Sequence, residues 1–192
     1  RQGGDRIVSR VEFGVFGGSF DPPHAAHVLL ASLALAVHGL ERVLVVPTHA
    51  HAFGKQLTAL DDRMRMCELA FAALRGVEIL DIERELPAPN YTLNTLRALA
   101  ERYPGAQLRL LIGADILPEA HAWHDFASIE RLAPPIVVER QGYASIDPDQ
   151  PALPGISSSE IRRRVHAGES THGWLSPAVQ RYIDTHGLYR SP

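Results

Sequence analysis

The apolar positions along the chain alternate between short β-branched runs and longer segments with a helical period. The run RVLVVP, residues 42–47, is apolar at every position after the first, which is typical of a strand buried on both faces of a parallel sheet. Similar runs predict further strands at residues 12–16, 77–82, 108–112 and 136–138. Because these runs alternate with helical patterns, the sequence predicts an α/β fold with a mostly parallel sheet.

The helical segments begin and end at typical capping residues. Residues 25–37 are apolar on nearly all sides, which predicts a helix buried from more than one direction. Two pairs of residues, Thr58 with Asp61 and Ser157 with Glu160, have the spacing of a capping box, and each pair predicts the start of a helix. A further helix is predicted over residues 93–103, and the last helix opens at Ser176-Pro177 and closes at Gly187.

Composition limits the class of protein and its partners. The chain has 192 residues, 45% of them hydrophobic, so one domain can bury a core. A net charge of −3 gives no general reason to expect nucleic acid or a membrane as partner. The single cysteine, Cys67, excludes an intramolecular disulfide. With no signal peptide and no long apolar run, we expect a cytoplasmic protein that binds neither membrane nor nucleic acid.

The stretch VFGGSFDPPHAAH, residues 15–27, joins the first predicted strand to the all-apolar helix. Ligands of open parallel sheets collect at the carboxyl ends of strands. Gly17 and Gly18 let the backbone approach a ligand closely, and the following helix start favours an anion. His24 and His27 share one face of that helix start, can donate hydrogen bonds to phosphate oxygen, and can carry positive charge if protonated. The stretch therefore predicts a phosphate-binding turn.

This turn has other interpretations besides the phosphate site. Neither the dinucleotide motif G-x-G-x-x-G nor the P-loop motif is present. Two histidines at this spacing could bind a metal, but no third ligand is evident. A plain Gly-Pro turn with two solvated histidines is the simplest alternative.

A second stretch, GISSSEIRRR at residues 155–164, again places small hydroxyl residues at a helix start. Backbone N–H groups and hydroxyls there can receive phosphate oxygens, and Arg162 can form a forked contact one turn later. The alternative is an ordinary capping box followed by a solvated basic face, which we favour for Arg163 and Arg164. Together with the first motif, Ser158 and Arg162 are predicted to hold phosphate.

Through these two motifs, the chain resembles the nucleotidyltransferase superfamily that shares an (H/T)-x-G-H motif with class I aminoacyl-tRNA synthetases. Within it, the chain resembles the bacterial nicotinate mononucleotide adenylyltransferases. Further matching stretches are NYT at residues 90–92, GAD at 113–115, Trp123 and the closing HGLYR. Pantetheine-phosphate adenylyltransferases, the nearest relatives, usually lack the NYT and Trp features.

The resemblance implies a fold and a reaction. The fold is a Rossmann-like open, mostly parallel sheet with helices on both faces, in one nucleotidyltransferase domain over residues 11–190 that follows a flexible segment, 1–10. Residues 157–190 form its C-terminal helical part. The reaction transfers AMP from ATP to nicotinate mononucleotide, giving nicotinate adenine dinucleotide and pyrophosphate in NAD biosynthesis. Mg²⁺ arrives with ATP, and no protein-held metal is expected. ATP and a pyridine mononucleotide are the expected partners, and a homo-oligomer is left open.

Residue by residue, the resemblance implies three groups of site residues. The catalytic group is His24, His27 and Arg162. The ATP-binding group is Gly17, Gly18, Ser19, Phe20, His24, His27, Gly113, Asp115, Ile156, Ser157, Ser158 and Arg162. The substrate-binding group is Lys55, Tyr91, Thr92, Trp123 and Arg140.

Several of these assignments have structural alternatives. Asp115 can accept hydrogen bonds from a ribose, or cap the following turn. Trp123 offers a flat face to a pyridine ring, or is simply a buried side chain at a helix start. The helix that opens at Tyr91 and Thr92 can receive the nicotinate carboxylate at its free N–H groups, or be capped by Asn90 or Thr92.

The chain departs from the family pattern at three places. Ala26 stands where the family has glycine between the histidines, and HAHAFGK at residues 49–55 replaces the usual PPHK loop. The stretch between Gly142 and Ile156 is short. Two alternative functions therefore stay open. One is adenylyl transfer to another phosphate acceptor, nicotinamide mononucleotide or pantetheine phosphate. The other is a degenerate homologue that binds nucleotide without turnover.

Overall fold

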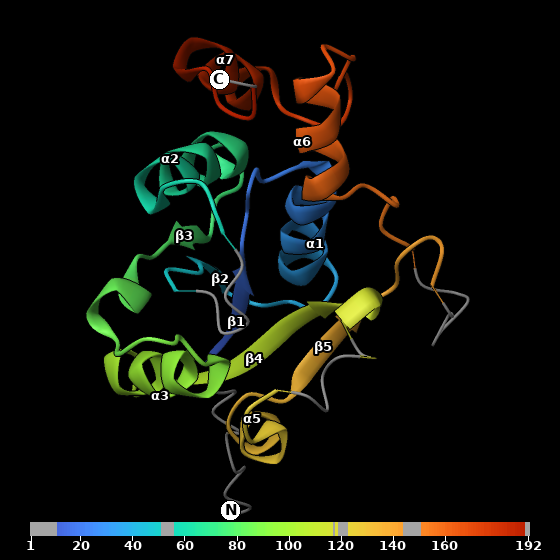
Figure 1. Ribbon diagram of the computed structural model, residues 1–192. Coiled ribbons are helices and arrows are strands. Elements are labelled where there is room, and N and C mark those ends of the chain that lie inside the picture. The colour runs from blue at the N-terminus through green and yellow to red at the C-terminus, as the bar shows by residue number, and fades with distance from the viewer. Residues whose placement is uncertain (1–10, 51–55, 117, 119–122, 144–150, 191–192) are drawn as a thin grey trace, which may run out of the picture.

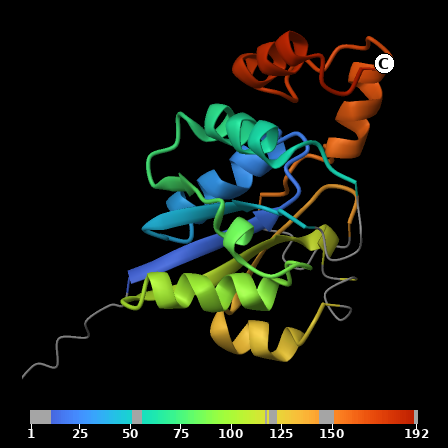
Figure 2. The same cartoon turned by 60° about the vertical axis from the view of Figure 1, so that its left-hand side comes forward.

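The structure is a computed structural model that describes residues 11–50, 56–116, 118, 123–143 and 151–190 (Figures 1 and 2). Within these residues, five parallel strands form one sheet in the order β3-β2-β1-β4-β5. The strands are β1 (Val11–Gly18), β2 (Arg42–Pro47), β3 (Val77–Ile79), β4 (Ala106–Gly113) and β5 (Pro135–Val138). The predicted α/β class with a Rossmann-like parallel sheet is confirmed. The predicted flexible segment, 1–10, lies outside the described residues.

The strand order places one switch point in the sheet. From β1 the chain moves outward through β2 to β3, and then returns to the other side of β1 to build β4 and β5. Val15 of β1 therefore pairs with Leu44 of β2 on one side and Leu110 of β4 on the other. In sheets of this kind, ligands bind at the carboxyl ends of the strands where the order reverses. Here that position is the carboxyl edge between β1 and β4.

Alternate residues of the central strands build two separate layers of core. Phe16, Val43 and Val45 face α1 (Ala25–Ala36) and α2 (Leu60–Phe71). Val15, Leu44 and Val46 face α3 (Thr92–Arg102) and α5 (Phe126–Leu132). Figures 1 and 2 show these two helix pairs on opposite sides of the sheet, so the prediction of helices on both faces is confirmed. Strands covered on both faces explain the continuous apolar runs in the sequence.

The last two helices form a third cluster beside α2. Helices α6 (Ser158–His166) and α7 (Pro177–His186) bury Ile161, Val179 and Ile183 around Met66 of α2. The segment between them reaches the start of α1, where the Ala25 N–H donates to the Trp174 carbonyl at 2.9 Å. The C-terminal helical part therefore lies over the carboxyl edge of the sheet (Figure 1).

Several helix ends follow the prediction. Ser157 caps α6 by accepting from the Glu160 N–H, and Ser176 caps α7 with Pro177 as its first residue. Gly187 ends α7 in the left-handed conformation, at φ 62°. Among the residues that the structure describes, no helix combines the length and the apolar character needed to cross a bilayer.

Other local predictions were wrong. Ala59 rather than Thr58 is the N-cap of α2, because the Thr58 N–H donates to Asp21 and its carbonyl accepts from Arg63. The predicted strand 77–82 ends at Ile79, and a 3₁₀ turn, η1 (Ile82–Glu85), follows. Helix α5 had not been predicted at all. A second 3₁₀ turn, η2 (Ala114–Ile116), follows β4.

Candidate active site

A cavity of about 770 Å³ opens at the carboxyl edge between β1 and β4. Its walls come from the β1–α1 turn, the start of α3, the ends of β4 and β5, and the start of α6. It brings together most of the residues predicted from sequence: Gly17, Gly18, Ser19, Phe20, His24, His27, Tyr91, Thr92, Gly113, Asp115, Trp123, Arg140, Ser157 and Ser158. Arg162 and Ile156 do not line it, and Lys55 lies outside the described residues.

The β1–α1 turn owes its shape to a buried ring. Phe20 adopts a left-handed φ of 47° and is only 1% exposed. Its ring packs edge-to-face against Phe16 and Phe71. A Cβ added to Gly18 would meet the Phe20 ring at 3.2 Å, whereas one added to Gly17 would meet nothing within 4 Å. A side chain at Gly18 would therefore crowd the Phe20 ring, while Gly17 leaves bare backbone open to a ligand.

The two histidines form a stacked pair at the start of α1. Their ring centroids are 3.7 Å apart with an interplanar angle of 23°. The backbone N–H of His24 donates to Nδ1 of His27 at 3.2 Å. A ring nitrogen that accepts a hydrogen bond carries no proton, so the neutral His27 ring holds its proton on Nε2. The backbone thus fixes the tautomer in which Nε2–H is the available donor.

Burial makes both histidines neutral. It lowers the pKa of His24 to about 3, with a further contribution from the charge of Arg140. The pKa of His27 is likewise held well below its usual value by burial, and then by His24 and Arg140. Near neutral pH the two rings therefore act as uncharged hydrogen-bond donors, and the positive charge that protonation would give them does not form. The alternative of solvated histidines is wrong for His24, which is 3% exposed.

Arg140 supplies the cation beside the histidine pair. Its guanidinium donates to the Asp115 carboxylate at the end of β4 and to the Ile156 carbonyl ahead of α6. Its Nε is buried without a partner among the described residues. A Cβ on Gly113 would lie 2.4 Å from Oδ1 of Asp115, so glycine is needed there for the carboxylate to reach Arg140. Asp115 itself lies within η2, and most of the turn that it was predicted to cap as an alternative lies outside the described residues.

The start of α6 is tied to the backbone of the histidine turn. The Ser158 hydroxyl donates to the Pro22 carbonyl at 2.9 Å, and the Arg162 guanidinium donates to the Asp21 carbonyl at 2.7 Å. Ile156 is buried in the third cluster. These two contacts join residues that are 136 and 141 positions apart in the chain, and they bring the two predicted phosphate motifs together.

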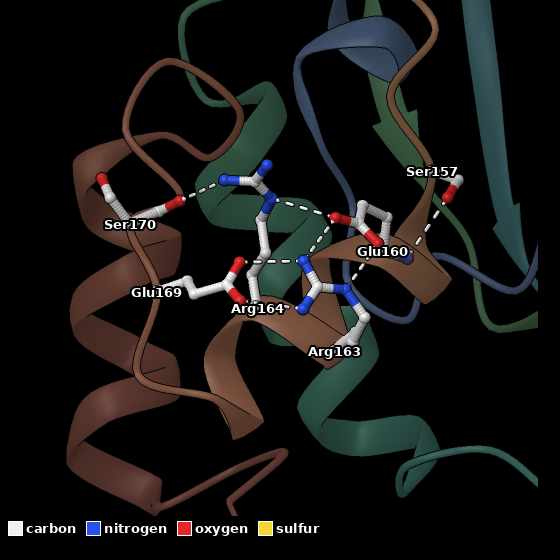
Figure 3. A network of polar contacts seen from close by, with 6 residues as sticks. All are labelled: Ser157, Glu160, Arg163, Arg164, Glu169 and Ser170. Atoms are coloured by element: carbon white, nitrogen blue, oxygen red, sulfur yellow. Dashed lines mark hydrogen bonds and ion pairs between the residues drawn. The ribbon is translucent and has the colours of Figure 1, made fainter.

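The outer face of α6 carries an ion-pair network (Figure 3). Arg163 pairs with Glu160 and Glu169, and Arg164 pairs with Glu160 while its guanidinium lies over the Trp174 ring. The arginines hold the pKa of Glu160 down to about 2. These pairs support the interpretation of Arg163 and Arg164 as a solvated basic face.

The opposite end of the cavity is aromatic. Trp123 packs edge-to-face on Phe126, with ring centroids 6.1 Å apart, and Tyr91 stacks on His124 at 4.7 Å. Thr92 is the first residue of α3, and no side chain caps that helix. The alternative of capping by Asn90 or Thr92 is therefore wrong, and the first N–H groups of α3 are open toward a ligand.

Glu83 and Asn90 are cavity residues that the sequence interpretation missed. The Glu83 carboxylate accepts from the His49 N–H at 3.0 Å and from the Thr95 hydroxyl at 2.9 Å, and burial raises its pKa. The Asn90 side chain accepts from the Ala50 N–H at 2.7 Å and donates to the Glu83 carbonyl. They anchor the beginning of the unusual loop to α3. For Glu83, the signal in the sequence was a charged residue directly after the apolar run predicted as a strand, where the carboxyl edge of the sheet was expected.

Ala26 lines the cavity and also packs into the core beneath it. It is 3% exposed and belongs to the cluster of Phe16, Phe20 and Leu30. Its methyl group therefore contributes to packing under the histidine pair. Across the described part of the chain, no group of three or more His, Cys, Asp or Glu side chains could hold a metal ion.

Comparison with known proteins assigns the chain to a family. The family model described as cytidylyltransferase-like matches residues 15–164, which include both phosphate motifs. The chain belongs to the cytidylyltransferase-like family. Its curated relatives include proteins named "Probable nicotinate-nucleotide adenylyltransferase". The one from Anaeromyxobacter sp. strain K is 44% identical over 93% of this chain and 97% of its own length. The one from Thermus thermophilus is 36% identical over 94% of this chain and its full length.

A solved structure matches this cytidylyltransferase-like fold. It is Plasmodium falciparum nicotinic acid mononucleotide adenylyltransferase complexed with NaAD, with a TM-score of 0.80. The match covers 93% of this chain and 97% of that chain, at 20% sequence identity. At that identity the similarity concerns the fold alone.

Proposed function

We propose that this chain transfers AMP from ATP to nicotinate mononucleotide, forming nicotinate adenine dinucleotide and pyrophosphate for NAD synthesis. The observation that carries the proposal is the stacked pair His24 and His27, held beside Arg140 between two helix starts and opposite an aromatic wall. The names of the curated relatives support the same reaction. The cavity has hydrogen-bond donors for phosphate oxygens at one end and flat aromatic rings at the other. This arrangement suits a pyridine mononucleotide and ATP together.

The chemistry is in-line substitution at phosphorus. A phosphate oxygen of the mononucleotide attacks the α-phosphorus of ATP, a new P–O bond forms, and the bond to pyrophosphate breaks. No protein nucleophile takes part, so catalysis consists of positioning and charge stabilisation. The Nε2–H of His27 and the guanidinium of Arg140 stabilise the charge that develops on the phosphoryl oxygens. Ser158, which lines the cavity, holds the phosphates that leave, and Arg162, which does not line it, would reach them from the next turn of α6.

Mg²⁺ enters this proposal as part of the substrate. Divalent magnesium prefers oxygen ligands and commonly reaches a site on the phosphates of ATP. The carboxylates that line the cavity already have partners, since Asp115 binds Arg140 and Glu83 binds His49 and Thr95. This donor set fits an ion carried by triphosphate better than an ion held by the protein.

The acceptor end favours an acid over an amide. The open start of α3 attracts a carboxylate on the pyridine ring by the helix dipole, an effect of about 0.3–1 kcal/mol at exposed sites. A neutral amide gains less from the dipole. We therefore expect nicotinate mononucleotide to be preferred to nicotinamide mononucleotide.

The reaction is tested by pyrophosphate release with ATP and a panel of acceptors. The expected result is the highest kcat/KM with nicotinate mononucleotide, ahead of nicotinamide mononucleotide and pantetheine phosphate. A higher kcat/KM with either of the other two acceptors would replace the substrate assignment. ATP binding without turnover on any acceptor would indicate the degenerate nucleotide-binding homologue.

Replacing Trp123 tests where the acceptor binds. Trp123→Ala removes the stacking face and should raise the KM for the mononucleotide roughly 2- to 10-fold, with little change in the KM for ATP. Trp123→Phe keeps a ring and should recover most of the affinity. Steady-state kinetics with each substrate varied in turn measures both. A rise confined to the KM for ATP would move the acceptor site elsewhere.

A further inference from the structure

Tyr189, near the end of the described chain, is bonded to the histidine turn. Its hydroxyl donates to Oδ1 of Asp21 at 2.7 Å, across 168 residues of sequence. Tyr189 adopts a left-handed φ of 63°, directly after the segment that closes α7. Asp21 lies in the β1–α1 turn between Ser19 and His24. A side chain from the C-terminal segment therefore holds the turn that carries the histidine pair.

The Asp21 carboxylate has no role as a ligand for substrate. It is 2% exposed, and it is absent from the cavity wall. Its second oxygen, Oδ2, accepts from the Thr58 N–H at 3.2 Å. Both oxygens are thus bound by protein groups from distant parts of the chain. A buried carboxylate satisfied in this way fixes the backbone that carries it.

The carbonyl groups of the turn also depend on distant side chains. Arg63, 1% exposed, donates to the Ser19 carbonyl at 2.9 Å. Arg162 donates to the Asp21 carbonyl and Ser158 to the Pro22 carbonyl. The guanidinium of Arg63 also places a buried positive charge near the buried Asp21 carboxylate. The conformation of the turn is therefore set from outside, by α2, α6 and the C-terminal segment.

We propose that Tyr189 is a positioning residue for nucleotide binding: its hydrogen bond to Asp21 holds the turn so that Gly17, Gly18 and the histidine pair meet the phosphates of ATP. This inference rests on the proposed function of the site. Tyr189 itself does not line the cavity, so it acts only through Asp21. Loss of this hydrogen bond should weaken the use of ATP and leave binding of the mononucleotide at the aromatic end unchanged.

Tyr182 is the matched control. It lies on α7 in the same C-terminal part, and its hydroxyl donates to Oδ1 of Asp62 on α2 at 2.9 Å. Both tyrosines therefore make one hydrogen bond to a carboxylate of another element, but only the bond of Tyr189 reaches the turn. Tyr189→Phe and Tyr182→Phe each remove one hydroxyl and leave the ring in place.

The first experiment compares kinetics and melting temperatures of the two variants. Tyr189→Phe should lower kcat/KM for ATP about tenfold and leave the KM for the mononucleotide within about twofold of wild type. Tyr182→Phe should leave both values within about twofold. Unchanged ATP kinetics in Tyr189→Phe, or an equal loss in both variants, would overturn the inference. Asp21→Asn, which removes the charge from the same hydrogen bond, should repeat the selective loss if Tyr189→Phe fails to fold.

The second experiment separates this inference from the proposed reaction. Calorimetry with α,β-methylene-ATP measures nucleotide binding without any acceptor or turnover. If wild type binds this analogue but turns over no acceptor, the proposed reaction fails. Weaker binding by Tyr189→Phe than by Tyr182→Phe still supports the positioning role in that case. Equal binding by the two variants, or no binding by wild type, would overturn it.

Discussion

Two helix starts meet at the same cavity with opposite chemistry. The start of α1 is buried, has no acidic residue in its first turn, and offers two stacked neutral rings above Phe20. The start of α6 lies toward solvent, is capped by Ser157 and carries Glu160, and the three arginines 162–164 follow in the middle and last turn of the helix. Both helices are suited to bind an anion, but α1 offers uncharged hydrogen-bond donors whereas α6 offers fully charged side chains.

Burial explains the difference. A buried imidazole loses the hydration that its charged form needs, so the neutral form persists and donates through N–H. An exposed guanidinium keeps its charge, but solvent and salt screen it. Buried neutral donors keep a fixed geometry where charge develops during the reaction. We propose that the exposed cations attract the triphosphate and hold its outer part, which would place the chemistry at α1 and the capture of nucleotide at α6.

The largest expected effect comes from His27. His27→Ala removes the Nε2–H donor and should lower kcat/KM by about 10²–10³ with the fold intact, because a half-buried side chain is lost rather than core volume. His38→Ala changes an exposed histidine just beyond the other end of α1 and should behave as wild type. Steady-state kinetics and thermal unfolding of both variants measure this. Turnover of His27→Ala close to wild type would contradict the catalytic assignment.

Arg162 and Arg163 test whether α6 captures nucleotide through one arginine. Arg162→Ala loses the contact to the turn and a predicted phosphate ligand, so kcat/KM for ATP should fall roughly 10- to 100-fold. Arg163→Ala removes only exposed pairs with Glu160 and Glu169 and should stay within about twofold. Kinetics at two salt concentrations should show a smaller salt dependence of the KM for ATP in Arg162→Ala alone. Equal losses in the two variants would instead assign a general electrostatic role to the whole face.

A separate expected effect concerns the pH dependence of stability rather than the rate. Unfolded histidines take up protons below their usual pKa of about 6.5, while folded His24, with a pKa of about 3, does not. The folded state therefore binds fewer protons in this range, and the free energy of unfolding should fall as pH is lowered from about 6.5 toward 3. Thermal unfolding at a series of pH values measures it, and His24→Asn should flatten the trend. A stability that increased on acidification in this range would contradict the neutral pair.

Elements with strong local signals were predictable from sequence. The run RVLVVP became β2 with the same ends, and Ser157, Ser176 and Gly187 cap helices as their types require. Helix α5 was missed because it has only seven residues and starts at Asp125, whose φ of 50° is left-handed. The strand at 77–82 was predicted too long because Leu80 and Ile82 continue the apolar pattern, although both lie after β3 and Ile82 opens a 3₁₀ turn.

The candidate site likewise combines features that were predictable from sequence with features that were not. The spacing of His24 and His27 predicted a shared face, and the structure has them stacked. Their neutrality was not predictable, because it follows from burial that only the tertiary structure creates. The bond from Tyr189 to Asp21 joins residues 168 positions apart and leaves no periodic signal. Sequence patterns report local geometry, whereas protonation and long-range hydrogen bonds depend on what packs around a residue.

The contact of Tyr189 with the histidine turn also bears on how the protein is made. Synthesis proceeds from the N-terminus, and the five strands that form the sheet, from Val11 to Val138, are complete well before residue 189. The nascent chain can thus pair its sheet early. The nucleotide turn has to wait, since one of its supports is among the last described residues. On the positioning role proposed for Tyr189, nucleotide binding becomes available only after residue 189 has been synthesised, and a chain that stops within α7 would contain the strands of the sheet but lack this support of the turn.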